Sequence, residues 1–132
     1  MFAFSLDQIF KAKENDNLKS WVIDFLAGDG NNRKLANTIR DTTPIQVELI
    51  EYPLIELIRI AGPEENMKFR EDKTVWEKRV QSFQESLNKG CELPPLIVTN
   101  FWNDLHISDG AHRHEALIRN GTKKYWTIFL KK

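Results

Sequence analysis

The chain has 132 residues, of which 41% are hydrophobic and 29% are charged, as in an ordinary globular domain. Nineteen basic residues balance nineteen acidic ones, so no overall positive charge drives the chain toward nucleic acid. The single cysteine, Cys91, excludes an internal disulfide and a metal site built from several cysteines. The first residues lack the features of a signal peptide, and no apolar run is long enough to cross a membrane. We therefore expect a cytoplasmic protein.

Three short helices are predicted in the first 44 residues, from apolar residues at helical spacing within 6–10, 18–26 and 35–39. Gly28 ends the second helix, and Asn31 or Asn32 caps the third. The intervening segment 28–32 begins like a calcium-binding loop, but Arg33 stands at the fifth position, where an oxygen ligand is required. We therefore interpret it as a turn that joins two helices.

The pattern changes after residue 44 to short strands mixed with helices. Ile45, Val47 and Leu49 alternate with polar residues, as in a half-buried strand that Pro53 interrupts. A capping box beginning at Thr74 precedes apolar residues spaced four, three and four, which predicts a helix closed by Gly90. Further strands are expected at 96–98, at 105–107 after a turn at Asn103-Asp104, and at 125–130. The prediction is an α+β fold: a helical cap over 1–44 and a small mixed sheet with helices over 45–132.

The most informative stretch is Ser108 to Leu117, where a strand passes into a helix through Gly110. Glycine at such a junction allows a tight turn and brings backbone N–H groups close to a ligand, and the helix dipole favours an anion there. The first helical turn carries Ala111, His112, Arg113 and His114, and Asp109 precedes it. This arrangement predicts a phosphate site with an acid beside it.

Each of these residues also has a purely structural interpretation. Asp109 caps the helix or pairs with Arg113, or else it accepts a proton or a metal ion. His112 and His114 are two residues apart and face different sides of a helix, so they do not share one metal site. We expect His112 to donate to a phosphate oxygen and leave His114 open between phosphate binding and a structural role. Zinc held by His106, His112 and Asp109 has no supporting ligand pattern.

Two further features lie outside this stretch. Glu64 and Glu65 follow Gly62-Pro63 in a loop and are either a solvated turn or a base plus a magnesium ligand. Trp102 stands at a predicted hairpin, where it is either packed or an exposed stacking surface.

From about residue 45 to 130, the order of elements and the pattern of Gly110, Arg113 and Ala116 resemble the ParB/sulfiredoxin superfamily. The resemblance implies that nucleotide phosphates bind on this turn. Sulfiredoxins carry a cysteine where this chain has Ala111, so their chemistry is not expected. ParB partition proteins continue into a helix-turn-helix, whereas this chain stops two residues after its last predicted strand, so centromere binding is not expected either.

The layout is most similar to the branch that resembles free-serine kinases. That likeness implies a phosphotransferase or NTPase that uses ATP or ADP with Mg²⁺ and acts on a small hydroxyl-bearing metabolite. Glu64 or Glu65 and Asp109 would be catalytic, residues 110–114 would bind the phosphates, and Glu65 or Asp109 would hold Mg²⁺. The alternatives are a nucleotide-switched binding module, with the first helices as the partner surface, and a DNA-associated ParB-like regulator or nuclease.

Overall fold

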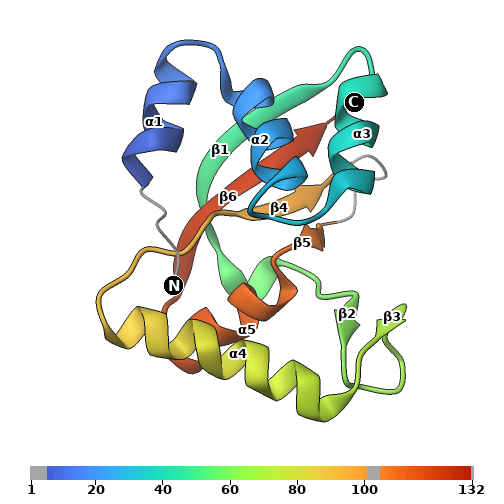
Figure 1. Cartoon of the computed structure of the whole chain (residues 1–132), viewed down its shortest axis with the longest axis vertical. Coiled ribbons are helices and arrows are strands. Elements are labelled where there is room, and N and C mark those ends of the chain that lie inside the picture. The colour runs from blue at the N-terminus through green and yellow to red at the C-terminus, as the bar shows by residue number, and fades with distance from the viewer. Residues whose placement is uncertain (1–5, 101–104, 132) are drawn as a thin grey trace.

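A computed structural model describes residues 6–100 and 105–131 (Figure 1). Five α-helices lie in the described chain: α1 (Leu6–Glu14), α2 (Leu18–Ala27), α3 (Arg33–Asp41), α4 (Lys73–Asn88) and α5 (Ala111–Arg119). The strands are β1 (Gln46–Pro53), β2 (Ala61–Gly62), β3 (Phe69–Arg70), β4 (Leu96–Thr99), β5 (His106–Asp109) and β6 (Lys124–Lys131), with a 3-10 turn η1 (Leu54–Glu56).

The central sheet has four strands in the order β1-β6-β4-β5. Strand β6 is antiparallel to β1 and parallel to β4, and β5 is antiparallel to β4, so the sheet is mixed. Strands β2 and β3 form a separate two-stranded parallel sheet. The α+β class expected from the sequence is confirmed.

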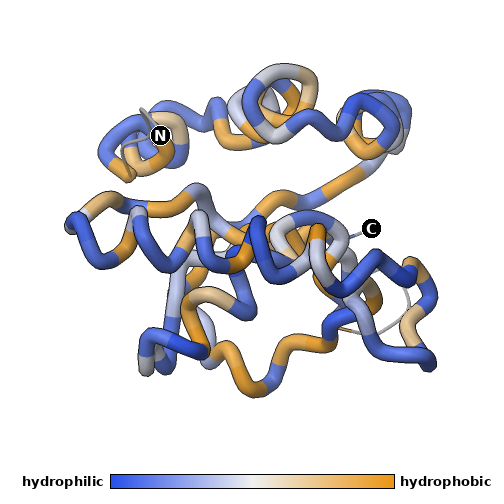
Figure 2. Tube along the Cα trace, turned by 60° about the horizontal axis from the view of Figure 1, so that its bottom comes forward, coloured by the Kyte–Doolittle hydropathy of each residue, from blue (hydrophilic) through white to orange (hydrophobic). Residues whose placement is uncertain are grey.

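Helices α1, α2 and α3 cover one face of the sheet and lie side by side as one layer in Figure 2. Side chains alternate along β6 because successive residues of a strand point to opposite faces. Ile128 and Leu130 therefore pack with Ile9, Leu26 and Ile39 of the three helices. The helical cap and the sheet thus share one hydrophobic core.

Helices α4 and α5 cover the other face, where they lie next to each other (Figure 1). Leu96 of β4 and Phe129 of β6 pack with Leu117 of α5 on this side. Trp76 of α4, which is almost completely buried, packs with Ala116 of α5. This packing fixes the start of α5 beside the end of β5.

Some element ends differ from those expected. Helix α4 is capped by Asp72, whose side chain accepts from the N–H of Val75 at 3.1 Å, and not by Thr74. Asn32 caps α3 by accepting from Leu35 N–H, and β1 runs as far as Pro53. The predictions for Trp102 and the Asn103-Asp104 turn fall outside the described residues. None of the described helices combines the length and the apolar character that a membrane span needs.

Candidate functional site

The turn at Gly110 joins β5 to α5 in a conformation that only glycine adopts readily. Its φ is 106°, and an added Cβ would lie 2.8 Å from Arg113 Nη2 and 2.9 Å from Leu96 Cδ2. Gly110 is also the N-cap of α5 and offers no side-chain acceptor. Because the first N–H groups of a helix lack partners within the helix, those of the first turn of α5 have neither a helical nor a side-chain cap partner.

Arg113 lies one turn into α5 and is 6% exposed. Its Nη2 donates to the Pro95 carbonyl at 2.9 Å and to Asp109 Oδ2 at 3.3 Å, and the guanidinium lies 5.9 Å from the centre of the Phe25 ring. Its Nε is buried and has no hydrogen-bond partner among the described residues. Arg113 therefore holds the turn together and still has an N–H to donate.

Asp109 does not cap α5; its carboxylate bridges two parts of the chain instead. Oδ1 accepts from the side-chain amide of Asn32 at 3.3 Å, while Oδ2 accepts from Arg113. Asn32 is the N-cap of α3, so this contact joins the layer of helices α1–α3 to the Gly110 turn. The side chain of Asp109 is 15% exposed and remains accessible to a ligand.

His112 is paired with Glu71, a residue that the sequence analysis did not single out. The two are 3.0 Å apart (Nε2 to Oε1), and the His112 ring lies 4.5 Å from that of Trp76. Arg79 Nη1 lies 3.8 Å from the same Glu71 oxygen. The only sequence signal for Glu71 is its position just before the helix that begins at residue 73.

The Gly110 turn borders two cavities. The larger has a volume of about 460 Å³ and is lined by Asp29, Gly30, Asn31, Arg79, Ser82, Phe83, Asp109, Gly110, His112 and Arg113. The smaller, of about 160 Å³, is lined by Ile60, Ala61, Phe69, Glu71, Ile107, Ser108, Asp109, Gly110, Ala111 and His112. We call these the large and the small cavity. Of the predicted site residues, Asp109, Gly110 and His112 border both, Arg113 borders the large one and Ala111 the small one.

His114 does not line either cavity. It is 5% exposed, and its Nε2–H donates to the Leu54 carbonyl at 2.8 Å, which ties α5 to the end of β1. Its Nδ1 is buried without a partner among the described residues. Burial lowers the pKa of His114 below its usual value of 6.5, so the imidazole is neutral.

This burial predicts a pH dependence of stability. The unfolded chain takes up a proton on His114 near pH 6.5, whereas the folded chain does so only at lower pH. The unfolding free energy contributed by His114 is therefore full above pH 6.5 and is lost as the pH falls toward the lower folded pKa. His114→Gln keeps a donor for Leu54 but does not titrate, so its unfolding free energy, measured in urea, should depend less on pH between 7 and 5. If the unfolding free energies of the wild type and of His114→Gln changed equally with pH, this prediction would be contradicted.

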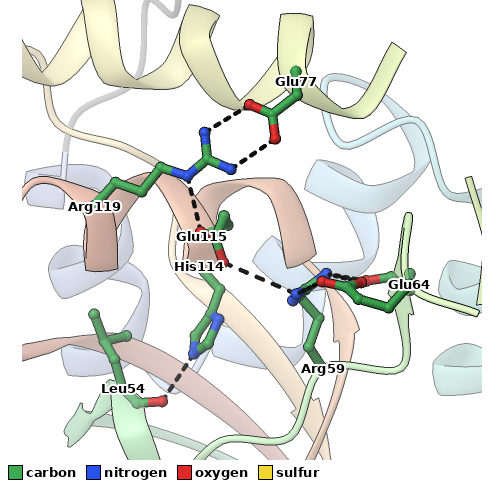
Figure 3. Close-up of polar contacts among 8 residues, drawn as sticks. Leu54, Arg59, Glu64, Glu77, His114, Glu115 and Arg119 are labelled. Carbon is green, nitrogen blue, oxygen red and sulfur yellow. Dashed lines mark hydrogen bonds and ion pairs between the residues drawn. The ribbon is translucent and has the colours of Figure 1, made fainter. Parts of the chain in front are cut away.

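Glu64 and Glu65 are not brought to the Gly110 turn. Arg59 pairs with both carboxylate oxygens of Glu64, with a distance of 3.1 Å from Nη1 to Oε2, and it lies 4.0 Å from Glu115 (Figure 3). Glu65 is exposed and lines neither cavity.

The network continues from Glu115 to Arg119. Arg119 forms a bidentate ion pair with Glu77, in which each of the two hydrogen bonds is 2.8 Å long (Figure 3). The Arg59 guanidinium lies 4.7 Å from the ring centre of Trp76. Arg59 also holds the pKa of Glu64 below its usual value. Glu64 therefore belongs to a surface ion-pair network between the β2–β3 loop, α4 and α5.

Glu64→Gln should accordingly leave ligand binding unchanged. Its side chain is 43% exposed, and exposed ion pairs contribute about 0–1 kcal/mol to stability. We expect the midpoint of urea unfolding to move only slightly and the nucleotide affinity, measured by calorimetry, to equal that of the wild type. A large loss of nucleotide affinity or turnover in this variant would show that Glu64 does take part in binding or catalysis.

The described residues contain no group of three or more His, Cys, Asp or Glu side chains arranged to hold a metal ion. The zinc alternative with His106, His112 and Asp109 is therefore not supported. Mg²⁺ differs, since it often takes only one or two protein carboxylates and completes its shell with water and phosphate oxygens. Of the two residues predicted to hold Mg²⁺, Asp109 lies at the turn and Glu65 lines neither cavity.

Comparisons with known proteins found one kind of similarity. No known protein family matches the chain in sequence, and no curated protein does. A solved structure is similar over 69% of this chain, with 15% sequence identity and a TM-score of 0.48. That neighbour is a Pnob8-like ParB-N domain. The similarity covers 32% of the neighbour's chain, so this chain corresponds to about a third of its length.

Proposed function

We propose that this protein binds the phosphate of a small molecule, in the first place a nucleotide, at the N-terminus of α5. The observation that carries the proposal is the uncapped first turn behind Gly110 next to Arg113, whose buried Nε has no partner among the described residues. Backbone N–H groups and an arginine are the donors that phosphate oxygens prefer, and the helix dipole adds to their attraction.

The large cavity supports this proposal by its size and its charges. About 460 Å³ lies within the range of small-molecule sites. Arg79 and His112 line the cavity together with Arg113, so three basic side chains border the space in front of the turn. The carboxylates that border it are Asp109, which is already paired with Arg113, and Asp29 of the loop between α2 and α3. Arg79 and Arg113 therefore bring positive charge to the space beside the turn, where Asp109 is paired.

The reaction class that we propose is phosphoryl transfer to a hydroxyl group or to water. Catalysis of this reaction consists mainly of positioning the phosphate and neutralising its charge. The Glu71–His112 pair borders the small cavity and would accept the proton of an acceptor hydroxyl there. Mg²⁺ bound with the nucleotide would neutralise phosphate charge, and Asp109 would hold it.

A second candidate is a nucleotide-responsive binding module without catalysis. The observation in its favour is that Glu64, one of the two loop carboxylates expected to be catalytic, is held by Arg59 away from the turn. A ParB-like DNA-associated regulator is a third possibility, against which the balanced charge of the chain argues. Release of phosphate or a phosphorylated acceptor would distinguish the first candidate from the other two.

Calorimetric titration with ATP, ADP and CTP, each with and without Mg²⁺, tests the proposal. We expect binding that weakens about tenfold in Arg79→Ala, the equivalent of one charge-assisted hydrogen bond. Lys78→Ala is the matched control: it removes the same charge from an exposed neighbouring position of α4 that does not line the cavity. Absence of binding by all three nucleotides, or equal losses in the two variants, would overturn the assignment.

A further inference from the structure

The loop between α2 and α3, residues 28–32, is folded tightly against the end of α2. The N–H of Gly30 donates to the Phe25 carbonyl at 2.7 Å, and that of Asn32 donates to the Leu26 carbonyl at the same distance. A Cβ on Gly30 would lie 2.8 Å from the Phe25 ring. Backbone hydrogen bonds and close packing therefore give this loop one defined shape.

One contact fixes the loop to the Gly110 turn, and a second joins the neighbouring end of α2 to it. The Asn32 side chain caps α3 through Oδ1, at 3.2 Å from Leu35 N, and donates through Nδ2 to Asp109. Phe25 lies against the guanidinium of Arg113. Held in this way, the loop forms one wall of the large cavity. Its position is fixed relative to the N–H groups that are proposed to bind phosphate.

The lining of the large cavity combines two kinds of chemistry. It includes the basic residues Arg79, His112 and Arg113, and the loop adds Asp29, Gly30 and Asn31. A carboxylate such as that of Asp29 only accepts hydrogen bonds and repels phosphate, but it accepts well from two neighbouring hydroxyl groups. The complementary ligand has phosphate at one end and hydroxyl groups at the other.

We propose that the α2–α3 loop recognises the hydroxyl-bearing end of the ligand, with Asp29 accepting from a vicinal diol. The ligand class is then a phosphate ester of a sugar or nucleoside rather than inorganic phosphate or polyphosphate. This inference rests on the proposed phosphate site and adds Asp29 as a specificity-determining residue. Because Asp29 lies between α2 and α3, the layer of helices α1–α3 would then contact the ligand directly.

The experiment compares three probes on the full chain by calorimetry: ATP, 2′,3′-dideoxy-ATP and inorganic tripolyphosphate. We expect the wild type to bind ATP about tenfold more tightly than the dideoxy compound, since a site built for hydroxyl groups discriminates against their absence. Asp29→Ala should abolish this preference by weakening ATP binding alone and should leave tripolyphosphate binding intact. Asp24→Ala, at an exposed position of α2 outside the cavity, is the control and should keep the preference.

A second variant tests the anchor of the loop. Asn32→Asp keeps a good N-cap for α3, because Asp and Asn cap equally well, but it replaces the amide donor with a carboxylate facing Asp109. We expect normal helix content by circular dichroism together with a reduced preference for ATP over the dideoxy compound. A merely structural Asn32 would leave that ratio unchanged.

The outcomes separate this inference from the proposed function. Equal affinities of the wild type for ATP and dideoxy-ATP, or a preference that persists in Asp29→Ala, would overturn the role of the loop while phosphate binding stands. Failure of all three probes to bind would overturn both. Loss of tripolyphosphate binding in Asp29→Ala would place Asp29 at the phosphate end and contradict the inference.

Discussion

Gly110→Ala is expected to lower the free energy of unfolding by about 2–6 kcal/mol and to abolish phosphate binding. Two costs add in this variant. A non-glycine residue at a φ of 106° is strained by about 1–3 kcal/mol, and overpacking costs a further 1–3 kcal/mol. The new methyl group would press on Arg113 Nη2 and Leu96 Cδ2. Leu96 lies in the core, so the relief must come from Arg113, which also holds the turn.

Gly121→Ala is the matched control for this prediction. Gly121 also has a positive φ, 80°, but an added Cβ there would meet no atom within 4 Å. The unfolding free energy of the control should therefore fall only by the cost of backbone strain, about 1–2 kcal/mol, and phosphate binding should be normal. Urea unfolding followed by tryptophan fluorescence measures both variants. If both variants lost the same unfolding free energy, the neighbours of Gly110 would accommodate the added methyl group without cost.

The sequence predicted those features that depend on neighbouring residues. The alternation of Val47 and Leu49 predicted a strand, apolar spacing predicted α1 to α4, and the Gly110 junction predicted the start of α5. The sequence left open whether Asp109 caps α5, and it does not. The two-residue separation of His112 and His114 also predicted their divergence, since one meets Glu71 and the other Leu54. Local periodicity is sufficient for each of these features.

The remainder of the site depends on contacts between distant parts of the chain. Glu71 and His112 are 41 residues apart, and Asn32 and Asp109 are 77 apart. Nothing in the spacing of a loop reveals which carboxylate lines a cavity, so the sequence pointed to Glu64 and Glu65 and gave no signal for Glu71. The segment 28–32 is a turn between two helices, as predicted, but its contact with Asp109 arises only when α2 and α3 pack on the sheet beside α5.

Arg113→Met is the other change expected to have a large effect. Methionine keeps much of the length and apolar contact of the side chain but leaves the Pro95 carbonyl and the Asp109 carboxylate without their donor. Breaking a buried ion pair by removing one partner costs about 3–5 kcal/mol, and the 15% exposure of Asp109 reduces this to about 2–4 kcal/mol. Urea unfolding without ligand measures the loss. An unchanged midpoint would show that Arg113 does not hold the turn.

A double variant separates this structural role from phosphate binding. In Arg113→Met with Asp109→Asn, a neutral amide replaces the carboxylate that has lost its partner, so part of the lost stability should return. Binding should not return, because the Arg113 guanidinium is missing from the turn and Arg79 alone borders the large cavity. Ligand linkage provides the measurement: 100 Kd of ATP should stabilise the wild type by about 2.7 kcal/mol and the double variant by almost nothing. If ATP stabilised both equally, Arg113 would serve the fold alone, and the backbone N–H groups of α5 would bind the phosphate without it.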